Sequence, residues 1–229
     1  MSVTVISLGG SIIVPGKPDS AFLKSFRDSI CSYLDERPED RLILVTGGGA
    51  PARIYQNALK EVAGDVPAPV LDWIGIRATH LNGMLVKSVL SGYAPDDLVT
   101  DPTAHIAFTG RVLVAGGWKP GFSTDTDAVL LAKRFNAGTV INLSNTKMIY
   151  TDDPRKNPEA KPIAKISWED FRMMVGDEWI PGKNVPFDPV ASKLAQEAGI
   201  KVIAADGRDI QNTLCILKGE EFTGTLIGA

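Results

Sequence analysis

The chain has 229 residues, of which 44% are hydrophobic and 22% are charged, and its formal net charge is −3. This composition is typical of a soluble globular protein, and it excludes an overall electrostatic attraction to nucleic acid or to anionic membranes. The length is sufficient for one large α/β domain, which we favour over two small lobes.

Few residues of the metal-binding and redox types are present. The chain has two cysteines, Cys31 and Cys215, and two histidines, His80 and His105, none with a neighbour at metal-site or redox spacing. We therefore expect reduced cysteines, and neither a zinc site nor a histidine-based triad. The first residues lack the basic segment of a signal peptide, and no apolar stretch is long enough to cross a bilayer, which favours a cytoplasmic protein.

Five short apolar runs rich in β-branched residues predict buried strands at residues 3–8, 42–46, 111–115, 139–143 and 201–205. The segments between them have helical periodicity, so the predicted fold is α/β, with a central, mainly parallel sheet sandwiched between helices. One long helix is expected at residues 72–92, with its methionine and leucine side chains in the core. Another helix is marked by a capping residue, Asp188, by Pro189 in its first turn and by Gly199 at its end.

Three of the predicted strands end in glycine-rich turns: SLGGS at residues 7–11, VTGGGAPAR at residues 45–53 and VAGGWKPGFSTD at residues 114–125. Glycine after a buried strand lets backbone N–H groups approach a ligand, and the N-terminus of a following helix adds partial positive charge. In a parallel sheet all three turns lie at the carboxyl edge, where open α/β folds bind ligands. The sequence therefore predicts a phosphate site, although it contains neither the P-loop motif nor the complete dinucleotide fingerprint.

The order of these motifs resembles that of the amino acid kinase family, and within it that of archaeal-type uridylate kinases. Six segments carry the resemblance over nearly the whole chain: VISLGGSI, VTGGGAPAR, DWIGIRATHLNGMLV, GGWKPGFSTDTDAVLLA, NTKMIYTDDPRKNPEAKPI and FDPVASKLAQEAGIKVI. The resemblance implies one domain over residues 1–229, with an acceptor-binding N-terminal half and an ATP-binding C-terminal half, usually in a homohexamer. It also implies Mg²⁺-dependent transfer of the γ-phosphate of ATP to UMP, a step of pyrimidine nucleotide biosynthesis.

Carried over residue by residue, the resemblance implies two groups of site residues. The ATP site would contain Ser7, Gly9, Gly10, Ser11, Gly49, Arg53, Ser144, Asn145, Tyr150 and Asp153. The UMP site would contain Gly48, Asp72, Trp118, Lys119, Pro120, Gly121, Phe122, Ser123 and Thr124. Arg53, Asp188 and Lys147 are the candidate catalytic residues, and no residue is assigned to a metal.

Some of these residues also have a purely structural interpretation. Asp72 would accept from the ribose hydroxyls of UMP. Arg53 is alternatively a solvated charge on a helix, and Tyr150 is alternatively a packed aromatic side chain. Asp153 is alternatively a turn residue before a proline, and Asp188 a helix cap.

The sequence departs from the family at three places. Many relatives have a lysine on the first strand, where this chain has Ser7, and Lys17 lies beyond the turn. The family pattern N-V-D-G-V-Y reads NTKMIY at residues 145–150, which loses an acidic residue and a glycine. Trp118 occupies a position where small or polar residues are usual.

We hypothesise that Lys147 replaces the missing first-strand lysine at the ATP phosphates, because phosphoryl transfer without a P-loop needs cations around the γ-phosphate. The alternative is a solvated loop lysine, with the charge supplied by Lys119, Lys183 or Lys193.

Two other functions stay open. One is a non-catalytic nucleotide- or oxoanion-binding protein similar to the molybdenum storage protein, which the lost acidic residue favours. The other is a kinase for a different small phosphate, such as isopentenyl phosphate. Asp72 and the intact loop GFSTDTDA favour the UMP kinase.

Overall fold

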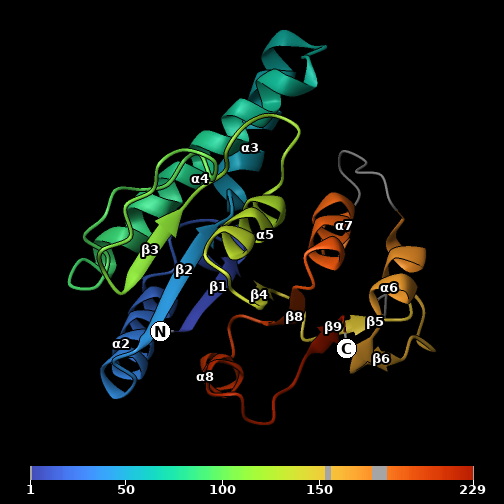
Figure 1. The fold of residues 1–229 in the computed structure, drawn as a ribbon. Helices are drawn as coiled ribbons and strands as arrows, with labels where there is room; N and C mark the ends of the chain where they lie inside the picture. The colour runs from blue at the N-terminus through green and yellow to red at the C-terminus, as the bar shows by residue number, and fades with distance from the viewer. Residues whose placement is uncertain (1, 153–155, 177–184, 229) are drawn as a thin grey trace.

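The computed structural model describes residues 2–152, 156–176 and 185–228. Seven strands form the central sheet in the order β3-β2-β1-β4-β8-β9-β7 (Figure 1). Their bounds are β1 Ser2–Leu8, β2 Asp40–Thr46, β3 Val112–Ala115, β4 Thr139–Ser144, β7 Lys165–Ile166, β8 Lys201–Asp206 and β9 Thr225–Ile227. Two further strands, β5 (Ile149–Tyr150) and β6 (Pro162–Ile163), form a separate antiparallel pair.

The sheet is mainly parallel, as the sequence predicts. The four neighbouring pairs from β3 through β2, β1 and β4 to β8 are all parallel, whereas β9 runs antiparallel to β8. All five predicted strands are confirmed, each with ends within two residues of the prediction. Apolar, β-branched runs of this length are therefore buried strands in this chain, as expected for a sheet covered on both faces.

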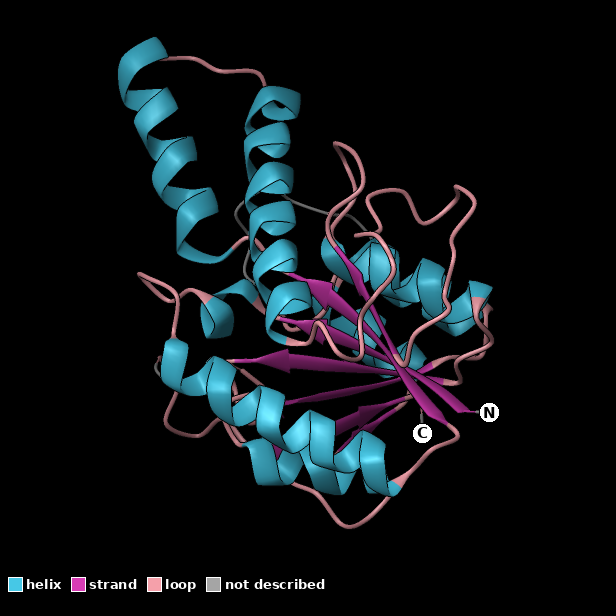
Figure 2. Ribbon diagram, turned by 90° about the vertical axis from the view of Figure 1, so that its left-hand side faces the viewer, coloured by secondary structure: helices cyan, strands magenta, loops and turns pink. Residues whose placement is uncertain are grey.

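Eight helices occur in the described part of the chain and cover both faces of the sheet (Figure 2). They are α1 Gly10–Ile13, α2 Ser20–Glu36, α3 Gly49–Ala63, α4 Ala68–Val89, α5 Thr124–Arg134, α6 Trp168–Val175, α7 Pro189–Glu197 and α8 Ile210–Lys218. As predicted, α7 is capped by the Asp188 side chain, which accepts from the N–H of Ala191.

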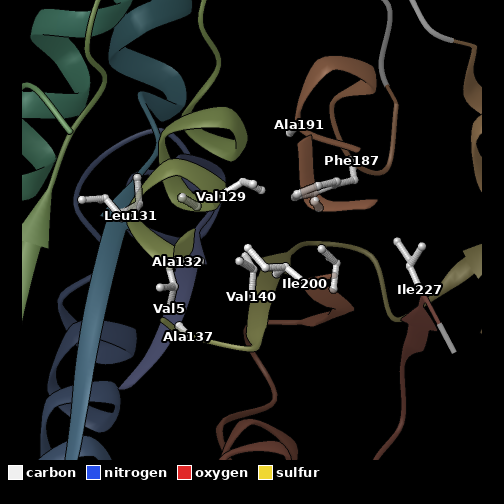
Figure 3. Packing of buried hydrophobic residues seen from close by; sticks show 14 of the residues in the cluster. Val5, Val129, Leu131, Ala132, Ala137, Val140, Phe187, Ala191, Ile200 and Ile227 are labelled. Carbon is white, nitrogen blue, oxygen red and sulfur yellow. The ribbon is translucent and has the colours of Figure 1, made fainter. Parts of the chain in front are cut away.

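Two hydrophobic cores lie on opposite faces of the sheet. Alternate strand residues enter opposite cores, as Val5 and Ile6 of β1 do. The core of Val5 also contains side chains of α5, α6 and α7, among them Val129, Phe171 and Ala191 (Figure 3 labels Val5, Val129 and Ala191). The core of Ile6 contains side chains of α1, α2, α4 and α8. The two helices important for the site, α4 and α5, thus pack on opposite faces.

The prediction for the long helix at residues 72–92 is wrong in two respects. The helix begins at Ala68, because Pro67 and Pro69 favour a first turn there, so Asp72 lies in the second turn rather than at the start. Its leucines and methionine are not all in the core: Leu81 is 66% exposed and Met84 is 49% exposed. The physical reason is that α4 and α3 pair and project beyond the sheet, so one face has no partner within the described residues (Figure 2).

None of the described helices combines the length and the apolar character that crossing a membrane requires. The two cysteines are free and half-buried, in agreement with the prediction of reduced residues.

Candidate active site

The glycine turns after β1 and β2 touch each other through their backbones. A Cβ at Gly10 would lie 2.1 Å from the nitrogen of Gly49, and Gly49 has a φ of +64°. Only glycine tolerates both conditions. The turn after β1 is also bonded to β4, because the N–H of Gly9 donates to the carbonyl of Leu143 at 2.9 Å. The first two predicted phosphate turns are therefore one continuous backbone surface at the carboxyl edge.

Both turns lead directly into helices. Gly9 and Gly48 occupy the N-cap positions of α1 and α3, and neither provides a side chain to bond the first N–H groups of its helix. N–H groups at the start of a helix need acceptors, and anions supply them. Ser11 and Gly49 lie in these first turns, where the sequence places the ATP phosphates.

Two carboxyl groups meet beside the first turn. Asp125 accepts from the hydroxyl of Ser7 at 3.0 Å and from the backbone N–H of Asp188 at 3.2 Å. Asp188 is 5% exposed, and its Oδ1 accepts from the N–H of Ala191 at 2.8 Å. Burial, followed by the negative charge of Asp188, raises the pKa of Asp125 to about 6.

No described lysine or arginine forms a salt bridge with this pair of carboxyl groups. Asp125 and Asp188 therefore provide oxygen ligands and negative charge at the edge where phosphates are expected, with no salt bridge to a described cation. Among the described residues no group of three or more histidine, cysteine or acidic side chains could hold a metal by itself. Two carboxylates nevertheless fit Mg²⁺ that arrives with a nucleotide, since Mg²⁺ is usually held by one or two carboxylates together with phosphates and water.

The third glycine turn begins residues 116–123, which join β3 to α5. We call them the acceptor loop, because the sequence assigns most of them to the UMP site. Side chains of α4 and α5 bond its backbone. The N–H of Gly117 donates to Thr79 Oγ1 at 2.7 Å, and the N–H of Gly121 donates to Asp72 Oδ2 at 3.0 Å. Asp72 thus contacts the acceptor loop, and the partner that the structure shows for it is the loop backbone.

Three side chains of the acceptor loop form a cluster. The rings of Trp118 and Phe122 are 4.9 Å apart in an edge-to-face arrangement, and Lys119 Nζ lies 3.8 Å from the centre of the Trp118 ring. The Trp118 ring is therefore packed against side chains of its own loop, in contrast to the small or polar residues of the family pattern. Thr124 begins α5, and the Ser123 hydroxyl caps it.

The remaining predicted residues lie on the opposite side of β1 or on the surface. Residues 144–150, which the sequence assigns to ATP and which we call the ATP segment, leave β4 next to β1. Its Asn145 and Lys147 are exposed, whereas Tyr150 is half-buried in β5. Arg53 is exposed on the second turn of α3. Asp153 and Lys183 lie outside the described residues, and Lys17 and Lys193 are exposed.

Two acidic residues of the site were not assigned from the sequence. Asp125 and Asp127 lie within the quoted segment GFSTDTDA, but acidic residues in a first helical turn are common because they favour the helix N-terminus. Only the structure shows that Asp125 faces Ser7 and Asp188, and that Asp127 is 1% exposed. A possible sequence signal is the pairing of two acids, two residues apart, directly after a glycine-rich loop.

The chain is similar to known proteins over its whole length. The family model described as the amino acid kinase family matches residues 2–206. A uridylate kinase of Methanospirillum hungatei JF-1 is 35% identical, with 99% of this chain and 95% of the relative covered. A uridylate kinase of Thermoplasma acidophilum is also 35% identical, with 97% of this chain and 95% of the relative covered.

The fold is likewise similar to that of a solved relative. The crystal structure of uridylate kinase from Archaeoglobus fulgidus has a TM-score of 0.83 and 31% sequence identity, and the match covers 99% of this chain and 100% of that one. Both the sequence and the arrangement of the elements therefore match the same group of proteins.

Proposed function

Because this chain belongs to the amino acid kinase family, we propose that it is a UMP kinase, which transfers the γ-phosphate of ATP to UMP and releases ADP and UDP. The observation that carries the proposal is the meeting of two glycine turns and the pair Asp125 and Asp188 at one edge of the sheet. Full-length similarity to proteins named uridylate kinase supports UMP as the acceptor. The whole chain acts as one domain in this proposal.

The two halves of the chain have different tasks in the proposed reaction. The N-terminal half binds UMP between α4 and the acceptor loop, where Asp72 accepts from the ribose hydroxyls with the carboxylate oxygen that the Gly121 N–H does not use. The C-terminal half binds ATP along the ATP segment. The phosphates of both nucleotides then meet at the backbone N–H groups of Gly10 and Gly49, with Arg53 one turn further along α3.

The transfer needs positioning and charge neutralisation more than proton transfer. A phosphate oxygen of UMP is already ionised, so it attacks the γ-phosphorus without a general base, and the bond from that phosphorus to the bridging oxygen of ADP breaks. Mg²⁺ bound with ATP would neutralise the charge on the transferred group, and Asp125 and Asp188 are the residues that would hold it. Lys147, on the ATP segment, supplies the cation that Ser7 cannot.

Assembly, location and pathway follow from the same proposal. We assign the chain to a cytoplasmic homohexamer in pyrimidine nucleotide biosynthesis. The exposed apolar side chains of α3 and α4 support assembly, because an unpaired apolar surface on two projecting helices is typical of a subunit interface. They are Ile54, Tyr55, Val62, Val70, Trp73, Leu81 and Met84.

An assay of ADP release with MgATP tests the function. UMP, CMP, AMP and isopentenyl phosphate are compared as acceptors, and we expect the highest kcat/KM with UMP. An Asp125→Asn variant purified in the same way controls for contaminating kinases, because its activity should be lower by about 100-fold or more, whereas that of a contaminant would be unchanged. An equal or higher kcat/KM for CMP, or no turnover with any acceptor, would overturn the proposal and favour a nucleotide- or oxoanion-binding protein.

A further inference from the structure

The peptide bond between Gly117 and Trp118 is held on both sides by side chains. Its carbonyl oxygen accepts from His80 Nε2 at 2.7 Å, and its N–H donates to Asp127 Oδ2 at 3.1 Å. Arg77 Nη1 lies 3.4 Å from His80 Nδ1 and can only donate, so Nδ1 is the acceptor and Nε2 carries the proton. One planar group at the start of the acceptor loop is therefore bonded at both of its polar atoms.

The two side chains come from opposite faces of the sheet. His80 belongs to α4, which packs into the core of Ile6, and Asp127 belongs to α5, which packs into the core of Val5. The acceptor loop leaves the carboxyl end of β3 between these two helices. The orientation of the peptide is consequently set by the two packed layers of the fold rather than by the loop itself.

Folding alone does not account for Asp127. Its side chain is 1% exposed, and its Oδ1 has no hydrogen-bond partner among the described residues. Burial raises its pKa to about 7. A buried carboxyl group with an unpaired oxygen destabilises the folded state, so an apolar residue of similar size would suit the core better. Burial lowers the pKa of His80, which keeps the imidazole neutral and is consistent with the assigned tautomer.

We infer that His80 and Asp127 are positioning residues that fix the Gly117–Trp118 peptide, and with it the acceptor loop, in the orientation that binds the acceptor nucleotide. This inference rests on the proposed function, which assigns the loop to UMP. A flip of the peptide would turn its carbonyl oxygen toward the carboxyl of Asp127 and its N–H toward the protonated nitrogen of His80. With Asp127 ionised, both contacts would then be unfavourable, so the loop is ordered before the nucleotide arrives and binding costs less entropy.

Paired substitutions test the inference by kinetics. Asp127→Leu and His80→Leu remove the hydrogen bonds, whereas Asp127→Asn and His80→Gln keep an acceptor and a donor. We expect each leucine variant to raise the KM for UMP about tenfold, as for one lost hydrogen bond to the loop. The kcat and the KM for ATP should change little, and the amide variants should stay within about twofold of the parent. The melting temperature of Asp127→Leu should be no lower than that of the parent, because an unpaired buried carboxyl is removed.

Amide hydrogen exchange provides a second measurement that does not depend on UMP. Exchange at residues 116–123 should become faster in both leucine variants and stay slow in both amide variants, with no change in the strands. Asp96→Leu is the matched control, because Asp96 also holds a loop backbone, through the N–H groups of Thr109 and Gly110 at the other end of β3. It should leave the KM for UMP unchanged.

The inference is overturned if both leucine variants keep the KM for UMP and the exchange rates of the parent. It is equally overturned if exchange becomes faster throughout the molecule, because the two side chains would then be only parts of the core. If the parent enzyme does not phosphorylate UMP, the proposed function fails, and the exchange at residues 116–123 still decides whether His80 and Asp127 hold the loop.

Discussion

The acceptor loop and the ATP segment are both polar stretches at the carboxyl edge of the sheet, yet they are held very differently. In the acceptor loop, backbone groups of Gly117, Trp118 and Gly121 are bonded by four side chains from α4 and α5. In the ATP segment, the hydroxyl of Ser144 accepts from the N–H of Thr146 within its own turn, and residues 145–147 are exposed.

Because of this difference, we expect the acceptor loop to determine how UMP is bound and the ATP segment to contribute to the transfer step. A loop whose backbone is fixed before binding offers one shape to the acceptor, so changes there should act mainly on the KM for UMP. In the ATP segment, the polar side chains face solvent and can become ordered when the nucleotide binds. Substitutions there should therefore act on kcat, through the transfer step. The acidic pair Asp125 and Asp188 lies between the two regions and should affect chemistry most.

The largest effect is expected from Asp125→Asn. The amide keeps the size of the side chain and removes the charge. The kcat should therefore fall by about 100-fold or more, as it does when other groups that stabilise the charge of a transition state are removed. Steady-state ADP release and a melting curve measure this. A well-folded variant with nearly normal kcat would exclude Asp125 from the transfer step and leave it as an acidic residue of the first turn of α5.

Arg53→Ala is expected to have the next largest effect. The arginine is exposed on α3, so its removal should leave the melting temperature unchanged. A charge-assisted contact to phosphate contributes about 1.5–3 kcal/mol, which corresponds to a loss of about 10- to 100-fold in kcat/KM. The same kinetics as the parent enzyme would show that Arg53 is a surface charge and that the backbone turns hold the phosphates without it.

Lys147→Met tests the ATP segment directly. If this lysine supplies the missing cation, kcat should fall about tenfold with a smaller change in the KM for UMP, the reverse of the pattern expected for His80→Leu. Lys147→Asp alone should not restore activity. The double variant Ser7→Lys with Lys147→Asp should restore it, because the new ammonium group would stand beside Asp125.

A kinetically silent Lys147→Met, or a Lys147→Asp variant as active as the parent, would show that Lys147 is only a solvated loop residue. The comparison between the two regions would then be lost, because the ATP segment would contribute no group to the transfer step.

The last expected effect is on stability as a function of pH rather than on kinetics. Asp127 has a pKa of about 7 in the folded chain against 3.8 for an exposed aspartate. The folded state therefore binds more protons than the unfolded state between these values, and the free energy of unfolding should fall as pH rises from about 4 to about 7. Asp125, with a pKa of about 6, adds to the fall.

Asp127→Asn should make this fall smaller, since each pKa unit corresponds to about 1.4 kcal/mol. Urea unfolding at several pH values provides the measurement, with Asp170→Asn as an exposed control. If parent and Asp127→Asn lose the same stability over this range, Asp127 is not the group that titrates.

A structural feature was predictable from the sequence where it depends on a few neighbouring residues, and not where it depends on contacts between distant segments. The strands follow from short β-branched runs, and Asp188 was predicted as a cap from its own neighbours, Pro189 included. The contact between Gly10 and Gly49 was predictable as a meeting of two turns, because parallel strands end at the same edge. These features depend on a few consecutive residues and on one rule of sheet topology.

Other features depend on packing between distant segments. The pattern of α4 predicted buried leucine and methionine side chains, but Leu81 and Met84 are exposed, since the helix projects beyond the sheet. Asp127 looked like an ordinary residue of a helix start, but it is buried and accepts from the N–H of Trp118 in the acceptor loop. Residue type and spacing do not contain that information.

The strand order also determines the sequence in which the sheet can assemble during synthesis. On one side β1 pairs with β2, which follows soon after it, but on the other side Val5 pairs with Val140 of β4. Domains begin to fold while the ribosome is still adding residues, so β1 has one open edge until β4 has left the exit tunnel. An open, apolar strand edge is a template for aggregation. Nascent chains that stop between β3 and β4 should therefore depend most strongly on chaperones.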